Sequence, residues 1–326
     1  MSGLGTGSRS GLRADDCADH AGNGMAVGTV DYLGERKGPA LRARESFEDV
    51  EHRVTPAARA GWLGGESDQP EDVCPVNILG VRVMPTDVPR AVARLEQWQT
   101  EGRRDYVCCV SVHGIVTAQR DEGIRGALNR AGLATQDGMP LVWWSRRVGQ
   151  AGARRVCGSD LLDAMCALGV KRGHRHFFYG ASPEVLERLV ARLVSRFPGL
   201  IVAGYRSPPF RSLTEEEDTA DVAAINEARP DYVWVGLGMP KQENWMASHV
   251  GRISATALIG VGAAFDFHAG TKPRAPTWMQ RSGLEWLFRL VSEPRRLAHR
   301  YLVDNSVFLA LALQQALGLR VYAKNL

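Results

Sequence analysis

Short apolar runs and amphipathic segments alternate along the second half of the chain. The apolar runs have the composition of buried strands, and the segments between them repeat apolar positions with the period of a helix. The expected strands cover residues 176–181, 200–204, 232–235 and 257–259, and the expected helices cover residues 183–197 and 214–228. This alternation favours a mostly parallel sheet with right-handed crossovers. The predicted fold class is α/β, with helices on both faces of the sheet.

The same pattern begins near Cys74. Residues 76–83 alternate like two short strands, and Asp87 has the position of an N-cap for an amphipathic helix. Two further apolar runs, at 106–110 and 133–136, indicate strands. An ordered core therefore starts about one fifth of the way along the chain.

Residues 1–72 differ from the rest. They contain twelve glycines, charges of both signs and no sustained period of 2 or 3.6. Such a segment buries too little apolar surface to offset the entropy of ordering, so we expect a disordered N-terminal extension. The alternative is a tail without function or a start codon assigned too early. The α/β core then spans 73–283, and a helical, basic C-terminal appendage spans 284–326.

Positive charge gathers near the C-terminus. The whole chain carries a formal charge of +4, but residues 272–326 alone hold nine Lys or Arg against three Asp or Glu. The basic residues alternate with apolar ones, which is typical of a peripheral surface for anionic lipid headgroups. The alternative is a solvated helix face that closes a homo-oligomer. The basic cluster comprises Arg289, Arg295, Arg296, His299 and Arg300.

Several function classes are disfavoured. The six cysteines are scattered without the spacing of a zinc site, which is typical of a reduced, cytoplasmic protein. The chain does not begin with a signal-peptide pattern, and polar residues interrupt the apolar segment 302–319, so we expect peripheral membrane contact without a spanning helix. The absence of a GxGxxG, a Walker loop or an Asp-x-Asp argues against an NAD-dependent oxidoreductase and leads us to expect neither a cofactor nor a metal. Nucleic acid is not an expected partner, because no binding motif accompanies the basic residues.

Two polar positions stand out beside predicted strand ends. Asp137 lies in an Asp-Gly turn between a strand and a helix, which places a carboxylate at the sheet edge near the positive end of that helix. Arg155 precedes another helix N-terminus, where its guanidinium suits a phosphate. Turn chemistry alone also explains Asp137, and a solvated surface arginine is the alternative for Arg155.

Several motifs in a fixed order resemble one family. The chain resembles the WecG/TagA/CpsF family of bacterial glycosyltransferases over about residues 74–301. The segments that carry this resemblance are QDGMP at 136–140, RVCGSD at 155–160, FFYG at 177–180, VGLGMPKQE at 235–243, GVGAAFD at 260–266, RAP at 274–276 and GLEWLFRL at 283–290.

The resemblance implies a Rossmann-like core and a specific transfer. A hexose of the N-acetylmannosamine type would pass from a UDP-sugar donor to a polyprenyl-diphosphate-linked glycan acceptor at the inner face of the cell membrane, with inversion and without a metal. Asp137 matches the family position of the general base, which would take the proton of the acceptor hydroxyl. Arg155 matches a substrate contact suited to the diphosphate leaving group.

The resemblance also implies contacts from other segments. Gln242 matches a site position that would contact a sugar hydroxyl, while its neighbour Glu243 is expected either to pair with Lys241 or to cap the next helix. Asp266 would orient a donor hydroxyl or else hold the Phe-Asp turn. In the appendage, Arg289 and Arg296 would reach the diphosphate when it closes over the site.

One motif departs from the family pattern. Where the family commonly has Thr-x-Asn after the strand at 106–110, this chain has Cys109 and Ser111, followed by His113. A thiol is a poor hydrogen-bond donor, so the contact made by the threonine is expected to be lost or to move to Ser111 or His113. This departure keeps open an alternative function, a non-catalytic nucleotide-sugar-binding or scaffold protein. His113 is a second acid/base candidate, with a structural histidine as the alternative.

Overall fold

The structure is a computed structural model that describes residues 74–322. The expectation of disorder at residues 1–72 lies outside the described residues.

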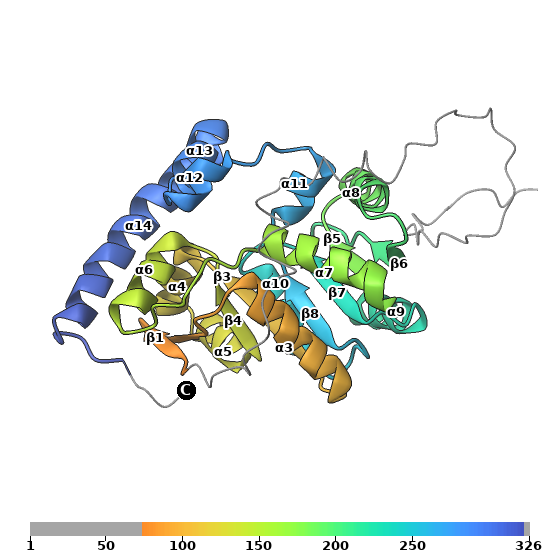
Figure 1. The fold of residues 1–326 in the computed structure, drawn as a ribbon, viewed down its shortest axis with the longest axis horizontal. Helices are drawn as coiled ribbons and strands as arrows, with labels where there is room; N and C mark the ends of the chain where they lie inside the picture. Colours follow the sequence, from red (N-terminus) through yellow and green to blue (C-terminus); the bar gives the residue numbers. More distant parts are fainter. Residues whose placement is uncertain (1–73, 323–326) are drawn as a thin grey trace, which may run out of the picture.

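Six parallel strands form the central sheet, in the order β4-β3-β8-β7-β5-β6 (Figure 1). The fold class predicted from the sequence is therefore confirmed. The strands are β3 (Asp105–Val110), β4 (Leu133–Gln136), β5 (Arg175–Gly180), β6 (Ile201–Arg206), β7 (Tyr232–Gly236) and β8 (Ala257–Gly260).

Helices cover both faces of this sheet. One face packs against α4 (Val112–Arg120), α5 (Glu122–Arg130), α9 (Glu215–Glu227) and α10 (Lys241–His249). The other face packs against α3 (Val88–Thr100), α7 (Gly158–Arg172), α8 (Pro183–Arg196) and α11 (Ala264–Ala269).

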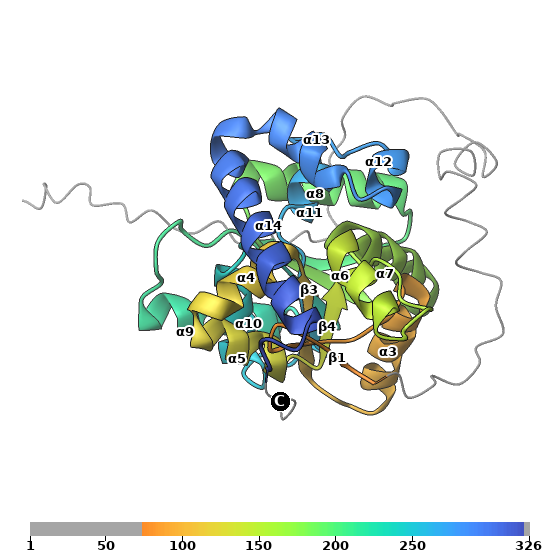
Figure 2. The ribbon, with the colours of Figure 1, turned by 90° about the vertical axis from the view of Figure 1, so that its left-hand side faces the viewer.

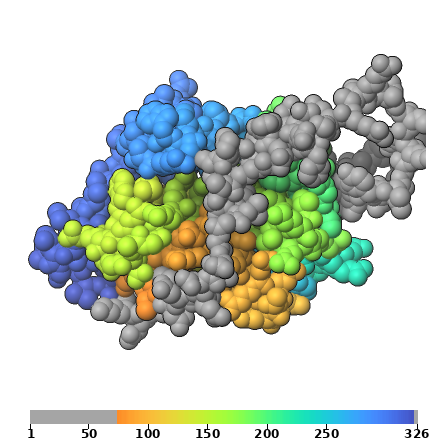
Figure 3. All heavy atoms as spheres, in the orientation of Figure 1, coloured from red at the N-terminus to blue at the C-terminus, as the bar shows by residue number. Residues whose placement is uncertain are grey.

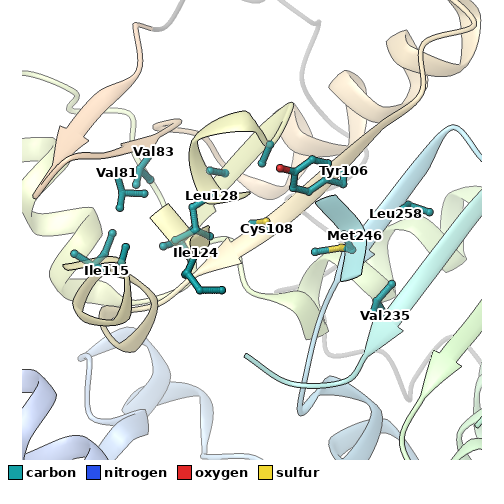
Figure 4. Packing of buried hydrophobic residues seen from close by; sticks show 14 of the residues in the cluster. Val81, Val83, Tyr106, Cys108, Ile115, Ile124, Leu128, Val235, Met246 and Leu258 are labelled. Carbon is teal, nitrogen blue, oxygen red and sulfur yellow. The ribbon is translucent and has the colours of Figure 1, made fainter. Parts of the chain in front are cut away.

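The two faces follow from the alternation of side chains along each strand. In β7, Val233 and Val235 point into the first core, whereas Tyr232 and Trp234 point into the second. Figure 4 shows part of the first core, where Val235 and Leu258 of the sheet lie near Met246 of α10. Apolar residues on both faces explain why these strands read as continuous hydrophobic runs.

Two smaller elements complete the core. A hairpin of β1 (Val76–Ile78) and β2 (Val81–Val83) forms a separate antiparallel pair, as predicted, with Gly80 in the turn at a φ of 81°. Helix α6 (Met139–Arg147) follows β4 directly, because Pro140 in its first turn suits a helix start.

The C-terminal helices form an arm that runs along one side of the core. They are α12 (Thr277–Arg281), α13 (Glu285–Ser292) and α14 (Pro294–Ala316). Helix α14 packs along α4, and its Phe308 and Ala312 are buried in the first core (Figure 2). At its far end, the Gln315 side chain accepts a hydrogen bond from Leu79 N–H at 2.9 Å and donates one to the Asn77 carbonyl at 3.0 Å. In Figure 3, α12 and α13 form a lobe above α6.

Candidate active site

Asp137 lies at the carboxyl edge of the sheet. It directly follows β4, and its N–H donates to the Val110 carbonyl of neighbouring β3 at 2.9 Å. This last hydrogen bond between the two strands sets the position of Asp137. Ser111 follows the end of β3 and caps α4, accepting a hydrogen bond from Gly114 N–H at 3.5 Å. Ligands of open α/β sheets bind at this edge, where the strands end and the helices begin.

Arg155 links Asp137 to the C-terminal arm. Its Nε donates to the main-chain carbonyl of Asp137 at 2.9 Å, and its Nη2 lies 3.6 Å from the Asp137 carboxylate. The same Nη2 lies 2.7 Å from Oε2 of Glu285, the first residue of α13. One guanidinium therefore holds two carboxylates, one from the core and one from the arm.

The surroundings make Asp137 a weaker acid than usual. Burial raises the pKa of Asp137 to about 7; the Arg155 guanidinium works in the opposite direction, and the Glu285 carboxylate raises the pKa further. The side chain still exposes about a third of its surface. A carboxylate with a pKa near neutrality and an open face is suited to accept a proton.

Two cavities meet at Asp137. The first, about 530 Å³, extends over the glycine-rich ends of β7 and β8 and the N-terminus of α7. The second, about 440 Å³, lies between α4, α6 and the arm and has a largely apolar wall. The residues that line both are Ser111, Asp137, Arg155, Glu285, Arg289 and Arg300.

Each of the nine site residues predicted from the sequence lines at least one of these cavities. The fold brings them together from segments up to about 190 residues apart, but their chemical roles stay predictions. Ser111, Asp137, Arg155 and Arg289 line both cavities; Cys109, Gln242, Asp266 and Arg296 line only the first; and His113 lines only the second.

Gln242 and Glu243 form a buried polar pair beside the first cavity. The Gln242 amide donates to Glu243 at 3.0 Å, and both side chains are almost fully buried, whereas Lys241 is exposed. Glu243 therefore bonds to Gln242 and not to Lys241. Burial raises the pKa of Glu243.

The residues that depart from the family pattern have different surroundings. Burial raises the pKa of the Cys109 thiol, so it stays protonated at neutral pH. The His113 Nδ1 lies 2.6 Å from Asp304 of α14, which ties α4 to the arm.

Asp266 accepts a hydrogen bond from Thr271 at 3.1 Å and lies 3.4 Å from Lys272, so it also holds its own turn.

Glu285, Arg300 and Phe210 also line the cavities, although the sequence did not predict them as site residues. Glu285 belongs to a segment that carries the family resemblance, and Arg300 belongs to the basic cluster, but neither pattern shows which residues turn inward. Phe210 lies in the loop after β6, lines the first cavity and is 85% exposed. An aromatic residue within a polar loop was the available signal for it.

Two kinds of feature are absent from residues 74–322. No group of three or more His, Cys, Asp or Glu is placed to hold a metal ion there. Within the same range no helix has both the length and the apolar character needed to cross a membrane.

Comparison with known proteins decides the family. The model of the glycosyl transferase WecG/TagA/CpsF family matches residues 76–322. The chain belongs to this family. The glycosyltransferase is similar to the N-acetylglucosaminyldiphosphoundecaprenol N-acetyl-beta-D-mannosaminyltransferase of Staphylococcus aureus strain MW2, with 28% identity over 224 residues that cover 68% of this chain and 86% of the relative. It is also similar to the enzyme of that name from Bacillus subtilis strain 168, with 31% identity over 179 residues that cover 55% of this chain and 68% of the relative. Membership confirms the prediction of a glycosyltransferase.

Proposed function

We propose that this glycosyltransferase moves an N-acetylmannosamine-type hexose from a UDP-sugar to a polyprenyl-diphosphate-linked sugar. The observation that carries the proposal is the position of Asp137, where a glycine-rich, cationic cavity meets an apolar one. The nucleotide-sugar is the charged substrate and suits the cationic cavity, whereas the lipid-linked acceptor carries a hydrocarbon chain and suits the apolar cavity. The similar enzymes of S. aureus and B. subtilis have names that specify such an acceptor and such a sugar.

The first cavity suits the donor. Gly238 and Gly262 let a ligand approach the backbone closely, because a Cβ at either position would meet no crowded neighbour, and the N-terminus of α7 favours an anion. Phe210 at the rim offers a flat apolar face on which a nucleobase can stack. The family resemblance implies a UDP-sugar, and the lining of this cavity supports the same donor independently.

Cations in the cavity suit the diphosphate. Arg289 and Arg300 line the junction of the two cavities, and within residues 74–322 neither forms an ion pair with a carboxylate. Arg289 instead lies over the Phe267 ring, at 5.6 Å from its centroid. Arg296 pairs with Glu293 at 2.7 Å. Arginines without counter-ions can stabilise the charge that grows on a departing diphosphate, the role we propose in place of a metal.

The reaction then needs one displacement. The acceptor hydroxyl oxygen attacks the anomeric carbon as the bond from that carbon to the UDP oxygen breaks, and UDP leaves with the electron pair. Asp137 takes the hydroxyl proton, and attack from the face opposite UDP inverts the configuration. Arg155 keeps Asp137 in place through the main-chain carbonyl and the carboxylate.

The arm also supports a peripheral position at the inner face of the cell membrane. Leu302, Leu309 and Leu313 on α14 are each at least 60% exposed, as is Val291 on α13. Arg295 and His299 on the same arm are exposed as well. Exposed leucines beside cations are the combination that binds anionic bilayers.

The donor assignment is tested by UDP release. The purified enzyme is incubated with farnesyl-diphosphate-linked N-acetylglucosamine and a panel of UDP-sugars, and UDP formation is followed with and without EDTA. We expect release with UDP-N-acetylmannosamine that survives EDTA. Phe210→Ala should raise the donor KM about tenfold, since stacking on a base contributes about 1–3 kcal/mol. Release only from donors with another nucleotide would contradict the UDP assignment, and loss of turnover in EDTA would contradict the proposed metal independence.

The pH dependence follows from the pKa of Asp137. Only the carboxylate form accepts a proton, so kcat/KM should fall about tenfold per unit as the pH drops below about 7. Glu285→Gln removes a charge that raises this pKa, so the acidic limb should move to lower pH. The matched control is Glu187→Gln on the exposed face of α8, which should leave the limb in place. A limb that stays or moves upward in Glu285→Gln would show that Glu285 does not act on Asp137.

A further inference from the structure

Two buried oxygen atoms lie without partners beside the first cavity, which we call the donor cavity. Gln242 and Glu243 are only 5% and 2% exposed, and both line this cavity. Within residues 74–322, neither Oε1 of Gln242 nor Oε2 of Glu243 has a hydrogen-bond partner. Buried polar atoms without a hydrogen bond destabilise a protein, and in native proteins they are rare and often mark a functional site.

The Gln242 amide lies against two glycines that follow each other closely at the end of β8. A Cβ at Gly260 would lie 3.1 Å from Nε2 of Gln242 and 2.6 Å from Met246, so the space on that side is filled. A Cβ at Gly262 would lie 3.5 Å from Oε1 of Gln242 and would meet nothing closer. Gly262 also lines the donor cavity, so a ligand atom beside it meets the amide oxygen of Gln242.

Glu243 determines which end of the Gln242 amide turns toward that space. Its Oε1 accepts a hydrogen bond from Nε2 of Gln242 at 3.0 Å. A carboxylate accepts hydrogen bonds but cannot donate one, so only the NH2 end of the amide can face it. Burial raises the pKa of Glu243, but a carboxyl that carries its proton on Oε2 pairs with the amide in the same way. The oxygen of Gln242 is therefore left for the cavity.

We infer that Glu243 is a positioning residue that holds Gln242 with its amide oxygen toward a hydroxyl of the UDP-sugar. The inference rests on the proposed function and extends it, because it names the chemical group that this part of the cavity selects. An amide oxygen pairs only with a group that donates a hydrogen bond. A site with such a fixed oxygen rejects an analogue that lacks the donating hydroxyl.

The place of this pair in the sheet agrees with a contact to a sugar. Helix α10 follows β7, which lies between β4, followed by Asp137, and β6, followed by the loop of Phe210. A UDP-sugar with its base at Phe210 and its reacting carbon near Asp137 places its ribose and hexose between these two residues. The first turn of α10 borders that middle part of the donor cavity.

A purely structural pair is the alternative explanation. Gln242 and Glu243 would then fasten the first turn of α10 to the core without affecting the choice of substrate. A change at Glu243 would lower stability and weaken the binding of all UDP-sugars alike. The two explanations therefore differ in the relative affinities of different UDP-sugars and not in the absolute affinity of any one.

The test compares UDP-N-acetylmannosamine with analogues in which fluorine replaces one hydroxyl of the hexose or of the ribose. Fluorine is close to a hydroxyl in size but cannot donate a hydrogen bond. Calorimetry without an acceptor substrate gives the Kd of the full-length enzyme for each compound. We expect the parent to bind one analogue about tenfold more weakly than UDP-N-acetylmannosamine, because the Gln242 oxygen then faces fluorine.

Glu243→Gln tests the positioning role, because it keeps the shape of the side chain but supplies an amide that also donates. Gln242 can then turn its NH2 toward the ligand, so the tenfold ratio should fall to about threefold or less while the ratios of the other analogues stay unchanged. Gln242→Ala should lose the same ratio, and adding Glu243→Gln to Gln242→Ala should have no further effect.

A matched control lies next to the pair. Lys241 is the exposed first residue of α10 and lines neither cavity, so Lys241→Gln should leave every ratio unchanged. Thermal unfolding shows whether each variant folds. The parent and Gln242→Ala alone decide whether the amide oxygen meets a hydroxyl, even if Glu243→Gln does not fold.

Three results would overturn the inference. The first is a parent that binds all the fluorinated analogues as tightly as UDP-N-acetylmannosamine. The second is a Glu243→Gln enzyme that binds every compound more weakly by the same factor, as expected for a structural pair. The third is an effect of Glu243→Gln on the ratio that persists in the Gln242→Ala background, which would mean that Glu243 does not act through Gln242.

Binding and turnover separate this inference from the proposed function. A ratio that depends on both Glu243 and Gln242, without transfer from any UDP-sugar, would contradict the proposed function and leave the positioning role standing. Transfer from UDP-N-acetylmannosamine by an enzyme that binds all the analogues equally would contradict the positioning role and leave the proposed function standing.

Discussion

Replacement of Asp137 by asparagine is expected to lower kcat by about 10²- to 10⁴-fold, the usual contribution of a general base. Asparagine keeps the shape of the side chain and the N–H that donates to the Val110 carbonyl, but its amide cannot accept the proton of the acceptor hydroxyl. Steady-state kinetics at saturating donor and acceptor measure the loss. The acidic limb near pH 7 should disappear from the residual activity, because the group that titrates there is gone.

Two controls separate the chemistry from the fold. Calorimetry with UDP should give a Kd for Asp137→Asn no weaker than that of the parent, since the change removes a negative charge and no cation from the donor cavity. Asp121→Asn, at the N-cap of α5, should keep full activity because asparagine caps a helix as well as aspartate does. An Asp137→Asn enzyme as active as the parent would refute the assignment of the base.

Replacement of Arg155 by methionine should lower kcat/KM by about 10²- to 10³-fold, comparable to the loss of one preorganised donor in other active sites. The change removes the donor to the Asp137 carbonyl and the partner of Glu285. It also removes a cation that lowers the pKa of Asp137, so the acidic limb of the residual activity should move above pH 7. The pH profile of kcat/KM measures both effects.

The chain offers a close control for this change. Arg154 is the preceding residue and its side chain is exposed, so Arg154→Met should leave activity unchanged. Arg155→Lys keeps the positive charge without the planar guanidinium. The acidic limb of its kcat/KM profile should therefore lie at a pH closer to that of the parent than the acidic limb of Arg155→Met. Equal losses in Arg154→Met and Arg155→Met would indicate a general effect of charge and not a specific contact.

The strands and their connections could be predicted from local pattern. Val233 and Val235 alternate with Tyr232 and Trp234, and both sets are buried, which is the mark of a strand covered on two faces. Asp87 was expected as an N-cap, and its carboxylate accepts a hydrogen bond from Arg90 N–H at 2.9 Å. Such features depend on neighbours within a few residues, so the sequence displays them directly.

The site was predicted in part for the same reason. Asp137 lies in a strand-to-helix turn, a position that sequence pattern identifies, and the family motifs added Arg155 and Gln242. The exposure of Phe210 and the inward position of Arg300 could not be read in this way. An arginine on an amphipathic helix has the same local pattern whether it faces solvent or a cavity.

By itself, the sequence determined the α/β class, the strand ends that border the site and the family. Only the tertiary structure decided that Glu285, 130 positions after Arg155, shares its guanidinium with Asp137 at the junction of two cavities. The reason is physical: periodicity and turn chemistry act over one or two turns of chain, whereas the charge around Asp137 and the apolar wall beside it arise from helices that pack together across the whole molecule.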